Sequence, residues 1–139
     1  EHFSTMDIGI FSAAVADYTP VEVASEKIKK KEDHFSVALQ KTTDILAEAG
    51  KQKKANQLIV GFALETENEL ANAADKLYRK NADAIVLNSL RVQGAGFRNN
   101  TNQITIINKK GEKLESELAS KKDIANQIVS YVITQLYES

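Results

Sequence analysis

The sequence contains no cysteine, and this absence excludes several kinds of chemistry at once. Disulfide bonds, thiolate nucleophiles and zinc sites built on thiolates all require that residue. Histidine is scarce as well, because only His2 and His34 are present, and two histidines alone cannot form a metal cluster. We therefore expect no metal ligands in the chain, and the lack of cysteine is consistent with a reducing, cytoplasmic environment.

Long apolar runs are also absent. The longest, Leu58 to Leu64, is far shorter than the roughly 20 residues that a membrane-spanning helix needs. The polar residues at the start of the chain do not resemble a signal peptide. The net charge is −1, from 18 basic and 19 acidic residues, so no overall field attracts nucleic acid or a membrane surface. We expect neither as a partner.

The length and composition that are present predict one globular domain over residues 1–139. Hydrophobic residues make up 42% of the chain, and a domain of this size buries roughly 70% of the surface of its unfolded chain. No low-complexity linker, internal repeat or long charge block divides the sequence. A second domain is therefore not indicated.

Three apolar runs lack the alternation of a half-exposed strand, namely Ile8 to Val15, Leu58 to Leu64 and Ala84 to Leu87. Such runs are typical of central parallel strands that are covered on both faces. Helical patterns separate them. The alternation predicts an α/β fold with an open, three-layer, Rossmann-like, mostly parallel sheet, helices on both faces and an antiparallel edge hairpin.

Two of the predicted helices lie between these strands. The first runs from Thr43 to Ala49 and stops at Gly50, because glycine is the preferred residue just beyond a helix end. The second starts at a candidate capping box formed by Thr66 and Glu69, and it extends to about Asn81.

The last third of the chain predicts a hairpin and a helix. Residues Gln103 to Asn108 and Lys113 to Glu117 are strand-like, and the glycine-containing turn between them is short. A third helix opens at Ser120 with Asp123 three residues later. Its apolar stripe consists of Ile124, Ile128, Val132 and Leu136.

The residues after the first apolar run are the most informative for function. Ala13 and Ala14 precede the carboxylate of Asp17, and ligands of open α/β sheets bind beyond the carboxyl ends of the strands. Small side chains let a ligand approach the backbone, and Asp17 can accept hydrogen bonds from sugar hydroxyls or a base amine. A turn carboxylate is the alternative for Asp17. We favour ligand binding because of its position, and Phe62 and Asn88 end neighbouring strands at the same edge.

A lysine-rich run from Glu26 to Asp33 follows. Mobile positive charge suits phosphate groups, although most such runs are solvated loops. The residues alone do not distinguish Lys27 from Lys29, Lys30 or Lys31 as the functional cation.

The order of these motifs resembles the bacterial phosphopantothenate-cysteine ligases, also called phosphopantothenoylcysteine synthetases. The most specific pair is AAVADY, Ala13 to Tyr18, followed by EKIKK, Glu26 to Lys30. Supporting matches are Lys41 to Leu46, Val60 to Thr66, Lys80 to Asp83, and Gly96-Phe97 with Thr101-Asn102. Members of the family also carry a glycine-rich strand and turn upstream, which nothing in this chain matches. The resemblance thus identifies the C-terminal portion of a CTP-dependent ligase domain.

The resemblance implies a reaction in two steps. 4'-Phosphopantothenate attacks CTP to give an acyl-cytidylate and pyrophosphate, and the amine of L-cysteine then displaces CMP. Mg2+ is expected on the triphosphate, without a protein ligand that we can name. The resemblance also implies a homodimer. In many bacteria the domain follows a flavoprotein decarboxylase that uses FMN, and no such segment is present here.

The resemblance implies roles for individual residues too. Lys27 becomes the catalytic lysine of a mobile flap that closes over the reacting phosphates, where a cation stabilises developing charge. Thr43 stands where the family normally has proline, which leaves the backbone groups of the helix start in place. The nucleotide-binding residues implied are Ala13, Ala14, Asp17, Lys27, Thr43, Asp44, Ile45, Leu46, Phe62, Lys76 and Lys80.

Three of these residues have simple alternative interpretations. Phe62 is also typical of a core aromatic residue in a buried strand. Lys76 and Lys80 lie four residues apart on one helix face, where lysines usually reach into solvent. Lys80 would also lie roughly 20 Å from the helix start that faces the cleft, unless a neighbouring subunit or a bent helix brings it closer.

Two other functions compete with the ligase. The chain could be a non-catalytic nucleotide-binding or assembly module that needs an upstream segment for activity. A dehydrogenase domain is the weaker alternative, because no G-x-G-x-x-G motif follows a strand.

Overall fold

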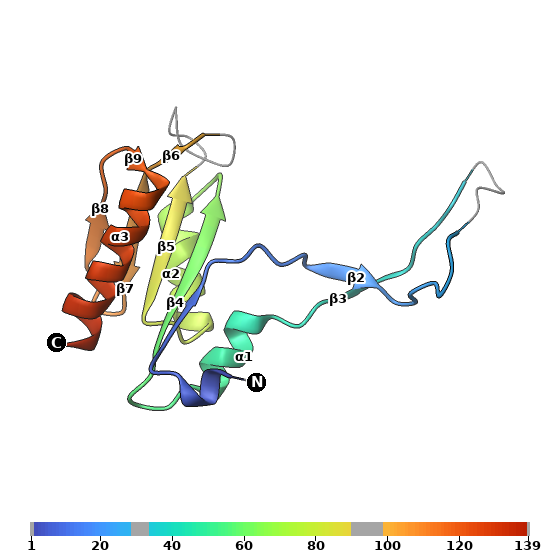
Figure 1. Cartoon of the computed structure of the whole chain (residues 1–139), viewed down its shortest axis with the longest axis horizontal. Helices are drawn as coiled ribbons and strands as arrows, with labels where there is room; N and C mark the ends of the chain where they lie inside the picture. The colour runs from blue at the N-terminus through green and yellow to red at the C-terminus, as the bar shows by residue number, and fades with distance from the viewer. Residues whose placement is uncertain (1, 29–33, 90–98, 139) are drawn as a thin grey trace.

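A computed structural model of the chain describes residues 2–28, 34–89 and 99–138. The body of the molecule contains a five-stranded sheet in the order β1-β4-β5-β7-β8 (Figure 1). Strands β1, β4 and β5 are parallel, whereas β7 and β8 pair antiparallel at one edge. This arrangement confirms the predicted α/β fold and its edge hairpin. The strand bounds are Ile8–Phe11 for β1, Leu58–Glu65 for β4, Ala84–Ser89 for β5, Ile104–Asn108 for β7 and Lys113–Glu115 for β8.

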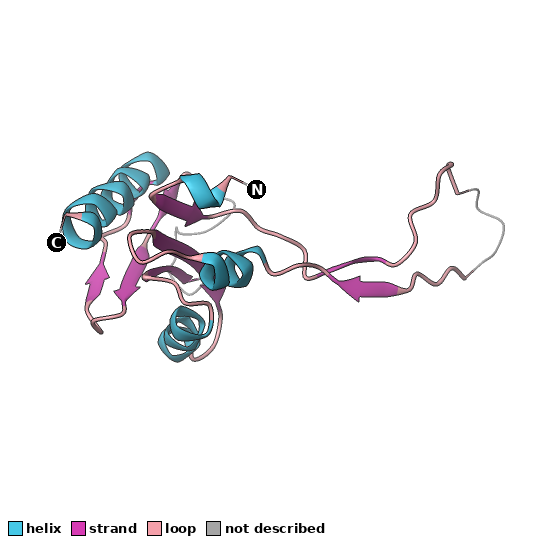
Figure 2. Cartoon of the chain, turned by 90° about the horizontal axis from the view of Figure 1, so that it is seen from below, coloured by secondary structure: helices cyan, strands magenta, loops and turns pink. Residues whose placement is uncertain are grey.

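Helices cover both faces of the sheet and complete the predicted three layers (Figure 2). Helices α1, Ile45–Gln52, and α2, Glu69–Arg79, pack on one face, and α3, Lys121–Tyr131, packs on the other. Each face has its own apolar cluster, and Ile59, Leu77 and Ile85 are at most 1% exposed in the first. The second cluster joins Val60, Val86, Ile106, Ile124, Ile128 and Val132.

The bounds of several predicted elements need correction. Strand β1 ends at Phe11, four residues before the predicted end at Val15. Helix α2 begins at Glu69, and its N-cap residue is Asn68, which has a left-handed backbone conformation, rather than the predicted Thr66. Helix α3 is confirmed, since Asp123 N donates to Ser120 Oγ at 3.1 Å.

Gly50 was predicted to end α1 but lies inside it. A Cβ atom at this position would meet the carbonyl oxygen of Lys80 at 1.9 Å. The glycine therefore allows the end of α2 to approach α1 closely, rather than forming a C-cap. Asn81 fixes the contact by donating to the Gly50 carbonyl oxygen at 2.9 Å.

A long two-stranded arm projects from the body (Figures 1 and 2). Its strands are β2, Tyr18–Pro20, and β3, Leu39–Lys41, which pair antiparallel. The residues alone indicated a solvated loop for the lysine run, and the resemblance implied a mobile flap, but neither predicted these two strands. Large apolar side chains are at least half exposed along the arm, namely Tyr18, Val21, Val23, Ile28, Phe35, Val37 and Leu39. Of the lysine run, Lys29 to Lys31 lie outside the described residues, as does the Gly96-Phe97 motif.

Short elements complete the chain. They are the 3-10 turn η1, Phe3–Thr5, the two-residue strands β6, Thr101–Asn102, and β9, Ala119–Ser120, and the π-helix η2, Val132–Tyr137, which continues α3. Strands β6 and β9 pair antiparallel near the start of α3. Within the described ranges, no helix is both long and apolar enough to cross a membrane.

Candidate functional site

The candidate site begins where β1 stops and β4 continues. The two strands pair from Ile8 with Leu58 to Phe11 with Gly61, and β4 then runs on to Glu65. Beyond Gly61, no described strand pairs with β4 on that side. The carboxyl end of the parallel strands therefore opens toward the root of the arm, and ligands of α/β sheets bind at such an edge.

The chain leaves β1 through the predicted AAVADY segment. Ala13, Ala14 and Asp17 are all exposed. The carbonyl oxygens of Ala16 and Asp17 accept hydrogen bonds from Thr42, the first from Oγ1 at 2.6 Å and the second from the backbone N–H at 3.0 Å. These bonds join the two ends of the arm at its root. Sequence reasoning missed Thr42, because only the fold reveals which segment it faces.

The other side of the root leads into α1. Asp44 caps this helix, since its Oδ1 accepts from the Ala47 N–H at 2.9 Å, while Thr43 is exposed just before it. Ile45 is half exposed, whereas Leu46 packs against the core beside Gly61. The side chain of Leu46 therefore has a packing role, and a ligand could meet this residue through its backbone.

Lys80 reaches the start of α1 without a neighbouring subunit or a bent helix. Its ammonium group forms an ion pair with the Asp44 carboxylate. The length of α2 does not separate Lys80 from the site, because the N-terminus of α1 lies within reach of the end of α2. The hydrogen bond from Lys80 holds the pKa of Asp44 below its ordinary value, and the bond from the Ala47 N–H acts in the same direction, against the opposing effect of burial.

Lys76 lies one turn before Lys80 in α2, and its side chain points toward β4. Its Nζ donates to the carbonyl oxygen of Phe62 at 2.8 Å, one residue beyond the point where β1 ends. The Phe62 ring is half-buried against the apolar cluster under α3, which agrees with the core interpretation. Lys76, Lys80, Asp44 and Phe62 thus form one group, although the sequence separates them widely.

Lys27 does not belong to this group in the described chain. It is exposed in segment 21–28, which continues from β2 away from the body (Figure 1). Its predicted catalytic role therefore requires either that the arm folds back or that another copy of the chain supplies the lysine.

A second polar contact lies at the same edge of the sheet. Asn102 Nδ2 donates to Asn88 Oδ1 at 2.8 Å, and Asn88 is the penultimate residue of β5. Among the described residues, Asn102 Oδ1 is the buried side-chain atom that lacks a hydrogen-bond partner. The sequence pointed to Asn88 through its place at a strand end, but the pairing depends on β6 and could not be read from it.

Within the described ranges, no group of three or more His, Cys, Asp or Glu side chains lies close enough to hold a metal ion. The Mg2+ expected on the triphosphate remains a prediction.

Comparison with known proteins places these observations in a family context. Residues 1–136 match the sequence profile of the DNA/pantothenate metabolism flavoprotein C-terminal domain. The chain is 49% identical over 137 residues to a cysteine/cysteine sulfinic acid decarboxylase from an unknown prokaryotic organism, covering 99% of this chain and 38% of that protein. It is 42% identical over 130 residues to the coenzyme A biosynthesis bifunctional protein CoaBC of Bacillus subtilis, covering 94% and 32%.

Solved structures agree with the sequence matches. The crystal structure of the C-terminal domain of a CoaBC protein superposes with a TM-score of 0.77 at 34% identity, covering 99% of this chain and 59% of that one. A mutant of Cab2 in complex with phosphopantothenate-cysteine superposes with a TM-score of 0.63 at 22% identity, covering 91% and 43%, and shares the fold. The chain spans about a third of the length of the curated relatives it matches.

Proposed function

The chain belongs to the DNA/pantothenate metabolism flavoprotein C-terminal domain family, and from that premise we propose that it serves a CTP-dependent phosphopantothenate-cysteine ligase of the cytoplasm. In the first step, the carboxylate oxygen of 4'-phosphopantothenate attacks the α-phosphorus of CTP, and the bond to the β-phosphate breaks to release pyrophosphate. In the second, the amine nitrogen of L-cysteine attacks the acyl carbon, CMP leaves with the bonding electrons, and the amine loses a proton.

One observation carries the proposal. Asp44, Lys76 and Lys80 converge at the open end of β4, beside the arm root where Ala16 and Asp17 bond to Thr42. The site thus combines cations, a helix N-terminus and a carboxylate, which are the groups that phosphates, a base and a ribose need. Mg2+ would arrive on the triphosphate and neutralise part of its charge.

The residues have separate tasks in this proposal. The free N–H groups at the start of α1, after Thr43, would receive acceptors of the base or a phosphate. Asp17 would accept a hydrogen bond from the ribose or the base amine. Lys76 lies beside the site with its Nζ on a carbonyl oxygen rather than a carboxylate, so its positive charge is not neutralised by that contact and can stabilise an anionic ligand.

We propose that a homodimer supplies Lys27. An isolated two-stranded hairpin is only marginally stable in water. The exposed apolar side chains of the arm therefore favour contact with another copy of the chain that covers them. An arm from one copy would carry Lys27 to the site of the other. There the lysine would stabilise charge on the α-phosphate as pyrophosphate leaves.

The acid substrate requires more of the domain. We expect an upstream glycine-rich strand and turn to pair with β1, whose outer edge has no partner strand among the described residues. Ile10 on this strand is 41% exposed, which a further strand beside β1 would reduce. A flavoprotein decarboxylase with FMN would be a separate, fused domain.

The rival function is a non-catalytic nucleotide-binding or assembly module. The 49% identical relative favours this alternative, because it contains a segment that matches this chain but is named as a decarboxylase and not as a ligase. Pyrophosphate exchange separates the two. The full-length protein is incubated with CTP, 4'-phosphopantothenate and labelled pyrophosphate, without cysteine, and label in CTP is measured. The ligase requires exchange that depends on phosphopantothenate, whereas binding of CTP without exchange would overturn it and leave the module.

A further inference from the structure

Strand β8 forms the outer edge of the sheet on the side away from β1. It pairs with β7, and no described strand pairs with its other side. The Ser116 N–H donates to the Ile104 carbonyl oxygen at 2.9 Å, and the Asn108 N–H donates to the Glu112 carbonyl oxygen at 3.2 Å. Backbone groups alternate in direction along an antiparallel strand. The backbone N–H and C=O groups of Lys113 and Glu115 therefore point away from the sheet.

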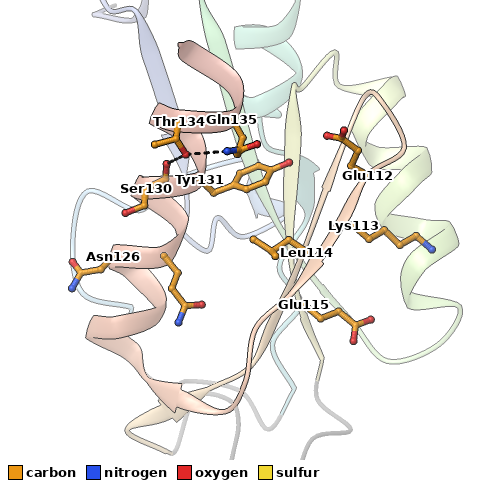
Figure 3. Close-up of a pocket in the computed structure, with 10 residues that line it drawn as sticks. Glu112, Lys113, Leu114, Glu115, Asn126, Ser130, Tyr131, Thr134 and Gln135 are labelled. Atoms are coloured by element: carbon orange, nitrogen blue, oxygen red, sulfur yellow. Dashed lines mark hydrogen bonds between the residues drawn. The ribbon is translucent and has the colours of Figure 1, made fainter. Parts of the chain in front are cut away.

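A groove accompanies this edge (Figure 3). It has a volume of about 610 Å³ and lies between β8 and the helix formed by α3 and η2. Leu114 faces it and is 46% exposed. The helix wall carries uncharged side chains, namely Asn126, Gln127, Ser130, Tyr131, Thr134 and Gln135.

Asn108 fixes both walls of the groove. This residue is 1% exposed, and its Nδ2 donates to Glu112 Oε2 at 2.6 Å and to the Tyr131 hydroxyl at 2.9 Å. Its Oδ1 accepts from the Lys110 and Glu112 N–H groups, which holds the turn before β8. The edge is therefore preorganised, and a partner that binds to it would not need to order it first.

We propose that β8 is an interaction surface for a second copy of this chain, paired antiparallel about a twofold axis at Leu114. In that register, Lys113 faces Glu115 of the partner subunit, and Glu115 faces Lys113 of the partner subunit. The outward backbone groups of both residues form hydrogen bonds, and side chains of opposite charge lie directly opposite each other. The two copies of Leu114 form the central pair, where Cα atoms approach to roughly 4.5 Å.

The charges of β8 distinguish it from an edge that is protected against pairing. Natural edges are often blocked by proline, a bulge or lysines that repel another copy. Here the signs at positions 113 and 115 are opposite, so the same two residues attract their own copy. The arm lies at the other end of the molecule (Figure 1), so the two surfaces do not compete.

The contact is expected to be weak by itself. Three residues bury less than the roughly 1,200 Å² typical of stable complexes. A second contact between the same assemblies, such as the homodimer proposed above, would reinforce it through a high effective concentration. A covalent trap is therefore the appropriate measurement.

Residues 1–139 contain no cysteine, so a thiol introduced among them is unique within this segment. Leu114→Cys places one thiol at the twofold axis, at a separation that a disulfide can span. Leu118→Cys is the matched control, because Leu118 is 48% exposed, is four residues away and is far from the axis in this register. Under mild oxidation, we expect Leu114→Cys to form disulfide-linked dimers on a denaturing gel on the order of tenfold faster. Equal rates would overturn the proposal.

Charge exchange provides the second readout. In the Leu114→Cys background, Lys113→Glu and Glu115→Lys each create like-charged pairs, and we expect each to slow cross-linking several-fold. The double exchange, Lys113→Glu with Glu115→Lys, restores opposite charges and should restore the rate. Failure to restore it would show that another contact brings the thiols together. Neither readout depends on CTP or on ligation, so the result stands apart from that of the pyrophosphate exchange.

Discussion

Lys80, the C-cap residue that follows α2, forms an ion pair with Asp44, the residue that caps the start of α1. The Lys80 side chain is 15% exposed and the Asp44 side chain is 51% exposed, so the pair lies partly within the protein. Thr42, two residues before Asp44, bonds to the arm root. One lysine thus connects α2 to the start of α1, close to the base of the arm.

The first prediction concerns how Lys80 affects nucleotide binding. If it acts by holding Asp44, Lys80→Met and Asp44→Asn should each weaken CTP affinity several-fold, and the double variant should be no weaker than the worse single one. Direct contact with the nucleotide would instead make the two effects multiply. Calorimetric titration of the full-length protein measures this. Arg79→Met is the control, because Arg79 pairs with Asp75 in solvent at 3.3 Å and should not change affinity.

The second prediction concerns pH. Because the pKa of Asp44 is held below its ordinary value of 3.8, chiefly by Lys80, the folded state favours the ionised carboxylate. Its contribution to stability is complete above pH 3.8 and is lost as the pH falls through the lowered pKa. Asp44→Asn should therefore lower the free energy of unfolding near neutral pH and approach the parent in acid. Urea titrations across this range measure it, and a constant difference would exclude a titrating Asp44.

The sequence predicted the elements whose patterns are long. Strands β4 and β5, the β7–β8 hairpin and α3 all follow from apolar runs or helical stripes, because those patterns report burial within one element. The resemblance implied a mobile flap here, but the strands of the arm could not be predicted, because its apolar side chains are exposed rather than periodic. Propensity decides little in so short a strand.

For the candidate site, the sequence likewise predicted some features and not others. The resemblance selected Asp44, Lys76 and Lys80, and the strand-end rule selected Asp17, Phe62 and Asn88, but neither predicted their contacts. The Lys80–Asp44 pair depends on how closely α1 and α2 pack, and that depends on Gly50. The sequence shows a glycine near a helix end, where a C-cap is the commoner explanation. Only the neighbouring helix reveals that the space is needed.

The third prediction tests this role of Gly50. Gly50→Ala should destabilise the protein by about 1–3 kcal/mol, because the added Cβ would overlap the Lys80 carbonyl oxygen and force the helices apart. If Gly50 acted only as a C-cap, this overlap with the Lys80 carbonyl oxygen would not be expected. Gly111→Ala is the comparison, since that glycine has a positive φ of 80° but nothing near its Cβ position. Urea unfolding gives both values, and a lower CTP affinity for Gly50→Ala alone would connect the packing to the site.

The fourth prediction concerns Lys27. Lys27→Gln should abolish ligation in the full-length enzyme and leave the free energy of unfolding unchanged, because the side chain is exposed on the arm and contributes no core area. Mixing it with an inactive Lys76→Met variant tests delivery between copies. If the arm acts on a partner, mixed dimers contain one site with both lysines, and some activity should return. Normal turnover by Lys27→Gln would show that the flap assignment is wrong.

The last prediction is that the site prefers CTP to ATP. The base would meet backbone groups near Ala14 and at the start of α1 after Thr43, and these groups belong to two segments that Thr42 joins at the arm root. Segments held together in this way leave a fixed space, so a purine would lack both room and matched partners.

Titration of the full-length protein with each nucleotide measures the difference, and UTP is the informative third ligand. It has the same ring size as CTP but replaces the exocyclic amine with a carbonyl oxygen. If Asp17 accepts a hydrogen bond from that amine, UTP should bind more weakly than CTP, and Asp17→Asn should reduce the discrimination. Equal affinities for CTP and ATP would contradict recognition of the base at the arm root and would favour a site that reads only the phosphates.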